Sequence, residues 1–291
     1  MNNEQEVLYQ KQYLDTLTLL CQQKQSKLES RVETQDCTGE AAVVANQVGE
    51  FPLQEKETRF ADTEYEDISL KRRWITPVLK NGTVLLDTLD LLKSSSDPTS
   101  AIVLAGHAAI NRFKDDVIFN GYYGTNRTGK NGEVSTSFAS GNVISSSAES
   151  GDIIKQINTV LQKMQDADVD LDYDEITMVV NGLAVKKLRE SGIYMSADFM
   201  NGKVLSEKVQ MPDYCGVTFV KMGKVPSYQD SGTVYKLPIF AKSGVKFGRW
   251  GIQKVRVQEE STKQYCPSIF MEAIYGACRT EEAKCYSIEM K

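Results

Sequence analysis

SSSDPTSAIVLAGHAAINRFKDDVIFNGYYG, residues 94–124, is the stretch that decides the fold, and it predicts one long helix with well-marked ends. Asp97 is a suitable N-cap, and Pro98 takes the first helical position, where a missing N–H costs nothing. At the other end, Gly121 or Gly124 can stop the helix. The chain therefore predicts a helix over residues 98–120.

The predicted helix is long and one-sided. About 23 residues at ~1.5 Å each give a rod of roughly 35 Å, about twice the average globular helix. Taken alone, it reads as an ordinary core helix. Its apolar stripe follows the spacing i, i+4, i+7, i+11 and consists of Gly106, Ile110, Phe113 and Val117.

Upstream lies a highly charged segment, EFPLQEKETRFADTEYEDISLKRR, residues 50–73, with seven acidic and five basic residues. Apolar and polar residues alternate at strand spacing from Ile68 to Trp74, and Asn81-Gly82 is a turn signal. We predict an extended two-stranded arm over about Phe51–Val78. Because a lone hairpin is marginal in water, we expect it to lie against something else.

The charges of this arm are sorted by sign, which leaves two interpretations open. A solvated charged hairpin accounts for them, and so does a contact with a neighbouring subunit, where complementary potentials fix the register. The candidate inter-subunit residues are Arg59, Asp62, Glu64, Glu66, Asp67, Lys71, Arg72, Arg73 and Trp74.

Composition excludes several classes of protein. A chain of 291 residues with net charge −5 can bury a large core and has no basic excess typical of a dedicated nucleic-acid binder. No apolar run is long enough to cross a bilayer, and the N-terminus lacks a signal-peptide core. The six cysteines show no zinc spacing, so we expect free thiols in a reducing compartment and no metal or other cofactor.

The rest of the chain is mixed. We predict a narrow-faced helix over residues 6–30 and an apolar-periodic segment over 83–93. A polar loop or weak hairpin follows over 125–151, and a compact α/β subdomain over 152–242. Within that subdomain we predict helices at about 152–167 and 182–191, and strands at 176–180, 217–220 and 234–241.

The last fifty residues predict β-structure. The strand candidates are Val255 and Val257, then 268–280, then 284–290, where Tyr286, Ile288 and Met290 share a face. Because the chain ends on a strand, we expect that strand to pair centrally with earlier elements.

Two motifs resemble ligand sites and fail on inspection. Residues 124–131, GTNRTGKN, nearly spell a phosphate-binding loop, but Asn131 replaces the Ser/Thr and the segment follows a helix instead of opening one. Residues 168–174, DVDLDYD, resemble a calcium loop, but neither frame has the required Gly and Glu. We read the latter as an acidic connection between a helix and a strand.

No catalytic constellation is evident in the sequence. His107 is the single histidine and lies inside the predicted long helix, where a packed or partly exposed histidine is the favoured reading. A Ser-His-Asp or Cys-His catalytic unit would have to use this histidine, and no pattern in the sequence identifies a nucleophile to pair with it. The sequence therefore predicts a protein that is not an enzyme.

The order of these segments resembles the major capsid proteins of tailed bacteriophages over nearly the whole chain. The resemblance rests on four stretches in sequence: LCQQKQSKLESRV (20–32), FPLQEKETRFADTEYEDISLKRRW (51–74), DPTSAIVLAGHAAINRFKDDVIFNGYYGT (97–125) and KLPIFAKSGVKFGRWG (236–251). No single motif is diagnostic, but their order and spacing are.

The resemblance implies an α+β protein with the Hong Kong ninety-seven-type phage capsid fold. It implies an N-terminal arm at 1–49, an extended loop at 50–80, a peripheral domain at 81–167 and 243–291 with the long helix 98–120 as its spine, and an axial domain at 168–242.

The resemblance also implies a function and partners. The chain would self-assemble into hexamers and pentamers of an icosahedral shell around double-stranded DNA, with which contact is non-specific. A separate scaffolding protein, a portal and a decoration protein would be partners, with no membrane involved. The shell would assemble in the host cytoplasm and end in the virion. Alternatives are a nanocompartment shell of the same fold around protein cargo, and a cytoplasmic α/β nucleotide-binding enzyme using residues 124–131.

Overall fold

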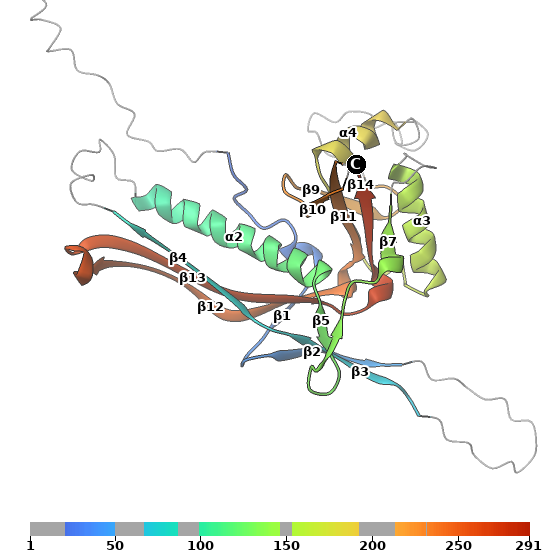
Figure 1. Ribbon diagram of the computed structural model, residues 1–291, viewed down its shortest axis with the longest axis horizontal. Helices are drawn as coiled ribbons and strands as arrows, with labels where there is room; N and C mark the ends of the chain where they lie inside the picture. The colour runs from blue at the N-terminus through green and yellow to red at the C-terminus, as the bar shows by residue number, and fades with distance from the viewer. Residues whose placement is uncertain (1–20, 50–66, 87–98, 146–152, 192–212, 231) are drawn as a thin grey trace, which may run out of the picture. The chain divides into compact units, whose positions relative to one another are not determined.

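A computed structural model describes residues 21–49, 67–86, 99–145, 153–191, 213–230 and 232–291. It confirms the predicted α+β class, with three α-helices and three sheets among these residues (Figure 1). The chain divides into two compact units. The described part of unit 1 falls within residues 1–26, 79–113 and 252–274, and unit 2 holds 27–78, 114–251 and 275–291.

The long helix, α2, spans Thr99–Tyr123 and confirms the central prediction from the sequence. It passes the first of the two candidate glycines, Gly121, and ends three residues beyond the predicted 120, at the second, where the Gly124 amide donates to the Asn120 carbonyl at 2.8 Å. The proposed N-terminal cap lies outside the described residues. The predicted stripe is confirmed at its three large members, which are all buried: Ile110, Phe113 and Val117.

Within unit 1, Gly106 completes that stripe by having no side chain. A Cβ built there would lie 1.9 Å from the Met271 sulfur. Glycine therefore lets Met271 of strand β13 (Cys266–Arg279) pack directly on the backbone of α2.

The six-stranded sheet of unit 2 has the order β7-β14-β11-β8-β9, and β10 pairs with β11 outside this path. Strand β11 runs antiparallel to β14 and β8, while the β8–β9 and β14–β7 pairs are parallel. The predicted central place of the C-terminal strand is confirmed. The strands are β7 (Val143–Ile144), β8 (Ile176–Val180), β9 (Val217–Lys221), β10 (Ser227–Gln229), β11 (Thr233–Ala241) and β14 (Cys285–Met290).

Helices α3 (Ile153–Asp166) and α4 (Gly182–Glu190) pack with this sheet, as their predicted positions require (Figure 1). The Asn181 side chain caps α4 by accepting from the Ala184 amide at 2.8 Å. All five residues of β8 are buried. The core they share also takes the three predicted residues of the last strand: Tyr286, Ile288 and Met290.

Two smaller sheets complete the described structure. One has the order β1-β12-β13-β4, with β1 (Glu33–Asp36), β12 (Val245–Glu260) and β4 (Val78–Leu85). The other has the order β2-β3-β5-β6, with β2 (Ala42–Val48), β3 (Leu70–Ile75), β5 (Asn126–Thr128) and β6 (Val134–Thr136). The β5–β6 pair confirms the weak hairpin predicted within 125–151.

The predicted helix over 6–30 is wrong over its described part. Residues 21–28 are irregular, and only a short 3-10 turn, η2 (Glu29–Arg31), follows. Side chains of α2 form hydrogen bonds with the backbone of this irregular segment. Asn111 Nδ2 donates to the Lys24 carbonyl at 2.9 Å, and Asp115 accepts from the Lys27 amide at 3.2 Å.

Two further predictions need correction. Asn81-Gly82 is not a turn, because both residues lie inside β4, an edge strand where glycine is tolerated. The α/β subdomain is also not confined to 152–242, since its sheet recruits β7 and β14 from outside that range. Most of the 83–93 segment lies outside the described residues; its start belongs to β4.

No helix in the described part of the chain is both long and apolar enough to cross a membrane.

Candidate assembly site at the base of the charged hairpin

The charged arm begins as an antiparallel pair formed by β2 and β3. Val48 pairs with Leu70, and Asn46 with Arg72, with a bulge between Val43 and Ala45. The structure confirms a strand, β3, within the predicted arm of 51–78, but its partner β2 lies wholly before that range, which corrects the predicted position of the first strand. Residues 50–66, which join the strands, lie outside the described residues.

The predicted interface residues have different environments. Arg59, Asp62, Glu64 and Glu66 lie outside the described residues. Asp67 and Lys71 are exposed, Arg72 and Trp74 are half-buried, and Arg73 is only 7% exposed. The buried face of β3 carries Arg73 and Ile75, and the alternating set from Ile68 to Trp74 lies on the other face. Arg73 is therefore an interior cation of its own chain.

A groove of about 490 Å³ lies at the paired ends of β2 and β3 beside the β5–β6 turn, and we call it the base groove. Of the eight described residues that line it, three are cations and none is acidic. Two large apolar side chains in it are exposed, Val48 by 68% and Leu70 by 76%. The three cations are Lys71, Arg72 and Lys130.

The β5–β6 turn closes one side of this groove. Trp74 Nε1 donates to the Gly129 carbonyl at 2.8 Å, and the Gly129 amide donates to the Arg72 carbonyl at 3.2 Å. Arg72 Nε in turn donates to Asn46 Oδ1 at 2.9 Å. Residues 124–131, which resemble a phosphate loop in sequence, follow α2 and span β5 and the start of the β5–β6 turn, so they do not connect a strand to a following helix as a phosphate loop does.

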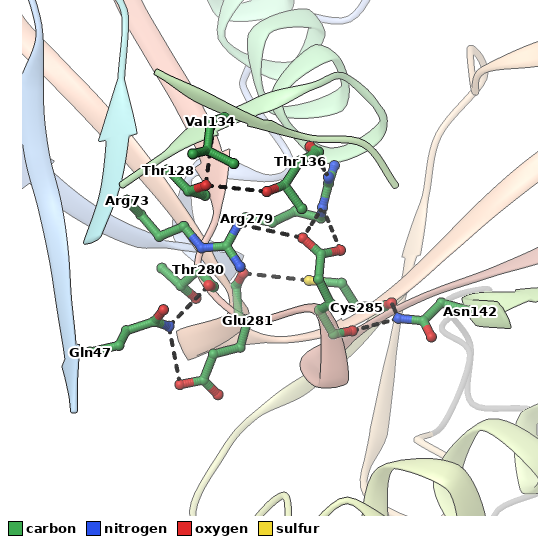
Figure 2. A network of polar contacts seen from close by, with 12 residues as sticks. Gln47, Arg73, Thr128, Val134, Thr136, Asn142, Arg279, Thr280, Glu281 and Cys285 are labelled. Atoms are coloured by element: carbon green, nitrogen blue, oxygen red, sulfur yellow. Dashed lines mark hydrogen bonds and ion pairs between the residues drawn. The ribbon is translucent and has the colours of Figure 1, made fainter. Parts of the chain in front are cut away.

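A shared glutamate ties the hairpin to the end of β13 (Figure 2). Glu282 Oε1 lies 3.6 Å from Arg73 Nη1, and its two oxygens accept from Arg279 Nε at 3.0 and 3.2 Å. Two buried guanidinium groups thus share one carboxylate. Because removing one member of such a set leaves an uncompensated charge beside a buried arginine, we expect the loss of any of the three to destabilise the subunit.

Arg279 also closes the C-terminal end of α2. Its side chain is fully buried, and Nη1 donates to the Gly124 carbonyl at 2.9 Å and to the Tyr122 carbonyl. Nη2 reaches the Thr136 carbonyl of β6 at 3.3 Å (Figure 2). A cation at a helix C-terminus is favoured by the helix dipole and satisfies carbonyls that have no partner inside the helix.

The root of the hairpin has a second polar tie and a small apolar core. Gln47 Nε2 donates to the Thr280 carbonyl at 3.0 Å and to Glu281 Oε1 at 3.4 Å (Figure 2). Beneath these contacts lies a cluster of four buried residues: Cys37, Val44, Ile75 and Cys278. The base groove is therefore carried on a fixed support.

The thiols near this root are held neutral. Burial raises the pKa of the Cys278 thiol from 9.0 to about 12, although nearby arginines oppose the shift. Burial raises the pKa of Cys285 as well. Because the thiolate is the reactive form, these buried cysteines are poor nucleophiles at neutral pH.

The described residues offer no alternative chemical site. No group of three His, Cys, Asp or Glu side chains among them could hold a metal ion, and His107 is exposed on α2. The acidic connection, residues 168–174, lies between α3 and β8 as predicted.

Arg279 and Glu282 are the residues that sequence reasoning missed. Nothing in SIFMEAIYGACRTEEAKC, residues 268–285, distinguishes the buried arginine and its glutamate from ordinary charges of a turn. Only the close approach of the α2 C-terminus and β3 to this turn identifies them.

Solved structures share this fold over nearly the entire chain. A structure from Mycobacterium phage Che8 has a TM-score of 0.70 at 16% identity, covering 97% of each chain. The capsid of Ralstonia phage GP4 has a TM-score of 0.73 at 11% identity, covering 97% of this chain and 95% of that one. The capsid of the empty GTA particle, computed with C5 symmetry, has a TM-score of 0.68 at 13% identity, covering 99% and 97%. A search of curated proteins found no match.

These likenesses define the class of fold as that of a capsid shell subunit. Residues 6–291 match the model of the phage capsid protein family, and the chain belongs to that family. It is a major capsid protein of the virion shell, a structural protein and not an enzyme. Neither the nanocompartment shell nor the nucleotide-binding enzyme is favoured.

Proposed function

We propose that this capsid protein assembles through the base of its charged hairpin into hexamers and pentamers of a closed icosahedral shell around double-stranded DNA. The observation that supports this most is the base groove. Val48 and Leu70 are exposed there beside three cations, on a support built from buried ion pairs. Exposed apolar area of this kind is typical of interaction surfaces, and surrounding charge fixes register.

The proposal also assigns a structural role to each part of the chain. Residues 1–49 act as an N-terminal arm and 50–80 as an extended loop. Residues 81–167 with 243–291 are assigned to a peripheral domain and 168–242 to an axial domain around the five-fold and six-fold axes, with α3, β7 and β14 placed in the axial domain because they share its sheet and core. A neighbour of this fold, the capsid of the empty GTA particle, is computed with C5 symmetry, which supports an arrangement of subunits around a five-fold axis.

Lys71 and Arg72, together with the acidic and basic residues of the adjoining loop, are the proposed inter-subunit contacts. Arg73 supports the arm from within its own chain. A separate scaffolding protein, a portal and a decoration protein complete the assembly in the host cytoplasm, and the packaged DNA is held without sequence-specific contact.

The test is to produce the full chain, alone and with its scaffolding protein, and to examine the product by negative-stain electron microscopy. We expect closed shells or sheets of hexamers. Only monomers in both preparations would contradict the proposal. A matched variant, Lys254→Glu, changes one exposed lysine of β12 that does not line the groove and should assemble as the parent does.

A further inference from the structure

The base groove has a definite chemical requirement. Its exposed apolar residues, Val48 and Leu70, lie opposite each other in the β2–β3 register and need an apolar or aromatic partner. Of the eight described residues that line the groove, three are cations and none is acidic. A ligand that suits it therefore combines one large apolar side chain with several carboxylates.

The chain carries such a segment on its surface in residues 166–175, DADVDLDYDE, which we call the acidic turn. Tyr173 is 90% exposed there, the highest value among the exposed large hydrophobic residues described. Three carboxylates beside it are exposed and form no ion pair with the described residues: Asp168, Asp170 and Asp172.

The acidic turn is held in one shape. Asp170 Oδ1 accepts from the backbone amides of Asp172 and Tyr173 at 3.2 and 3.3 Å, and the Asp174 amide donates to the Asp170 carbonyl at 3.2 Å. Val169 is buried beneath it. Because the turn is already ordered, docking it costs little conformational entropy, and its exposed tyrosine can act as an anchor.

We propose that the acidic turn of one copy of the chain docks in the base groove of another copy. Tyr173 lies against Val48 and Leu70, and the carboxylates face Arg72, which shares a face of β3 with Leu70, and Lys130. Groove and turn are different surfaces, so the contact is heterologous, and such contacts close into rings when the rotation allows. This inference rests on the proposed shell function and names the surfaces that carry it.

A cross-linking experiment tests the contact within assembled particles. In a parent chain carrying Cys21→Ser and Cys215→Ser, which removes the two exposed cysteines, Val48→Cys is combined with Tyr173→Cys. Mild oxidation should join different copies and give a covalent ladder on a denaturing, non-reducing gel. The matched control combines Val48→Cys with Tyr265→Cys, another exposed tyrosine, and should give no ladder.

A charge exchange gives an independent readout. Lys130→Glu and Asp172→Lys should each lower particle yield by at least roughly tenfold, because like charges then face each other across the contact. Combining them should restore most of that yield. Thermal unfolding of each variant, unchanged from the parent, excludes misfolding as the cause.

The outcomes separate the inference from the proposed function. Parent particles without a ladder, or with an equal ladder in the Tyr265 control, would overturn the docking contact while leaving the shell function standing. Single charge variants that assemble like the parent, or a combined variant no better than either, would also overturn it. A parent that forms no particles with its scaffolding protein would contradict the proposed function and the inference with it.

Discussion

The six-stranded sheet and the base of the charged hairpin belong to the same unit but use their residues in opposite ways. In the sheet, every residue of β8 is buried, and the apolar residues of β11 and β14 meet α3 within one chain. At the hairpin base, Val48 and Leu70 remain exposed, while a charged residue, Arg73, is buried instead. The first region completes its own core, and the second presents an apolar surface with a charged support beneath it.

This difference separates the region that stabilises a single subunit, the sheet, from the region suited to contacts between subunits, the hairpin base. Burial of apolar residues in the sheet stabilises the fold of a single copy. Surface apolar and charged residues of the groove contribute little to that fold but suit association. The Arg73–Glu282–Arg279 ion set connects these two regions. It links β3 of the hairpin to the end of β13 and to the C-terminal end of α2.

The largest expected effect comes from removing the buried cation at this connection. Arg279→Met leaves Glu282 beside only Arg73 and leaves the last carbonyls of α2 without their donor. We expect a loss of about 3–5 kcal/mol in the free energy of unfolding, measured by urea denaturation of the assembly-free subunit. Lys284→Met, at a half-exposed lysine of the same turn, is the control; an equal loss there would contradict a special role for Arg279.

The next effect tests the close approach of α2 to β13 in unit 2. A Cβ at Gly121 would lie 2.4 Å from the Ala277 carbonyl oxygen, a backbone atom that cannot move aside cheaply. We expect Gly121→Ala to lower the free energy of unfolding by about 1–3 kcal/mol. Gly141→Ala, where nothing lies within 4 Å, should stay within about 0.5 kcal/mol of the parent.

A smaller effect comes from alkaline pH acting on the buried thiols. Burial raises the pKa of Cys278 from 9.0 in the ordinary thiol to about 12, so the folded state holds a proton that the unfolded state releases. That contribution is present below pH 9 and is lost as pH rises toward 12. Unfolding measured across this range should show falling stability, less steeply in Cys278→Ala; the same slope in both would contradict the assignment.

The fold could be predicted from the sequence wherever a segment buries its apolar residues within its own subunit. The stripe of α2, the buried run of β8 and the alternation of β14 all report burial within the subunit, and the structure confirms them. The N-terminal helix failed over its described end because Asn111 and Asp115 of α2 supply the hydrogen bonds from far along the chain. Local sequence patterns do not indicate such distant partners.

The candidate site was predicted only in outline. Charge sorting located the hairpin, but the pattern gave no sign that Arg73 points inward while Arg72 does not. Arg279 and Glu282 escaped notice for the same reason, since a buried ion set and an ordinary charged turn look alike until the helix end reaches them. Placement of these charges depends on tertiary contacts and not on periodicity.

The most direct test of the central claim is to compare folding and assembly of Lys71→Glu/Arg72→Glu with those of the parent. The account predicts a thermal unfolding midpoint close to that of the parent subunit, together with loss of particles in negative-stain images of the preparation with scaffolding protein. A control, Lys254→Glu/Arg256→Glu in β12, should both fold and assemble. Particles from the hairpin variant in parental yield would contradict the claim that the base of the hairpin carries assembly.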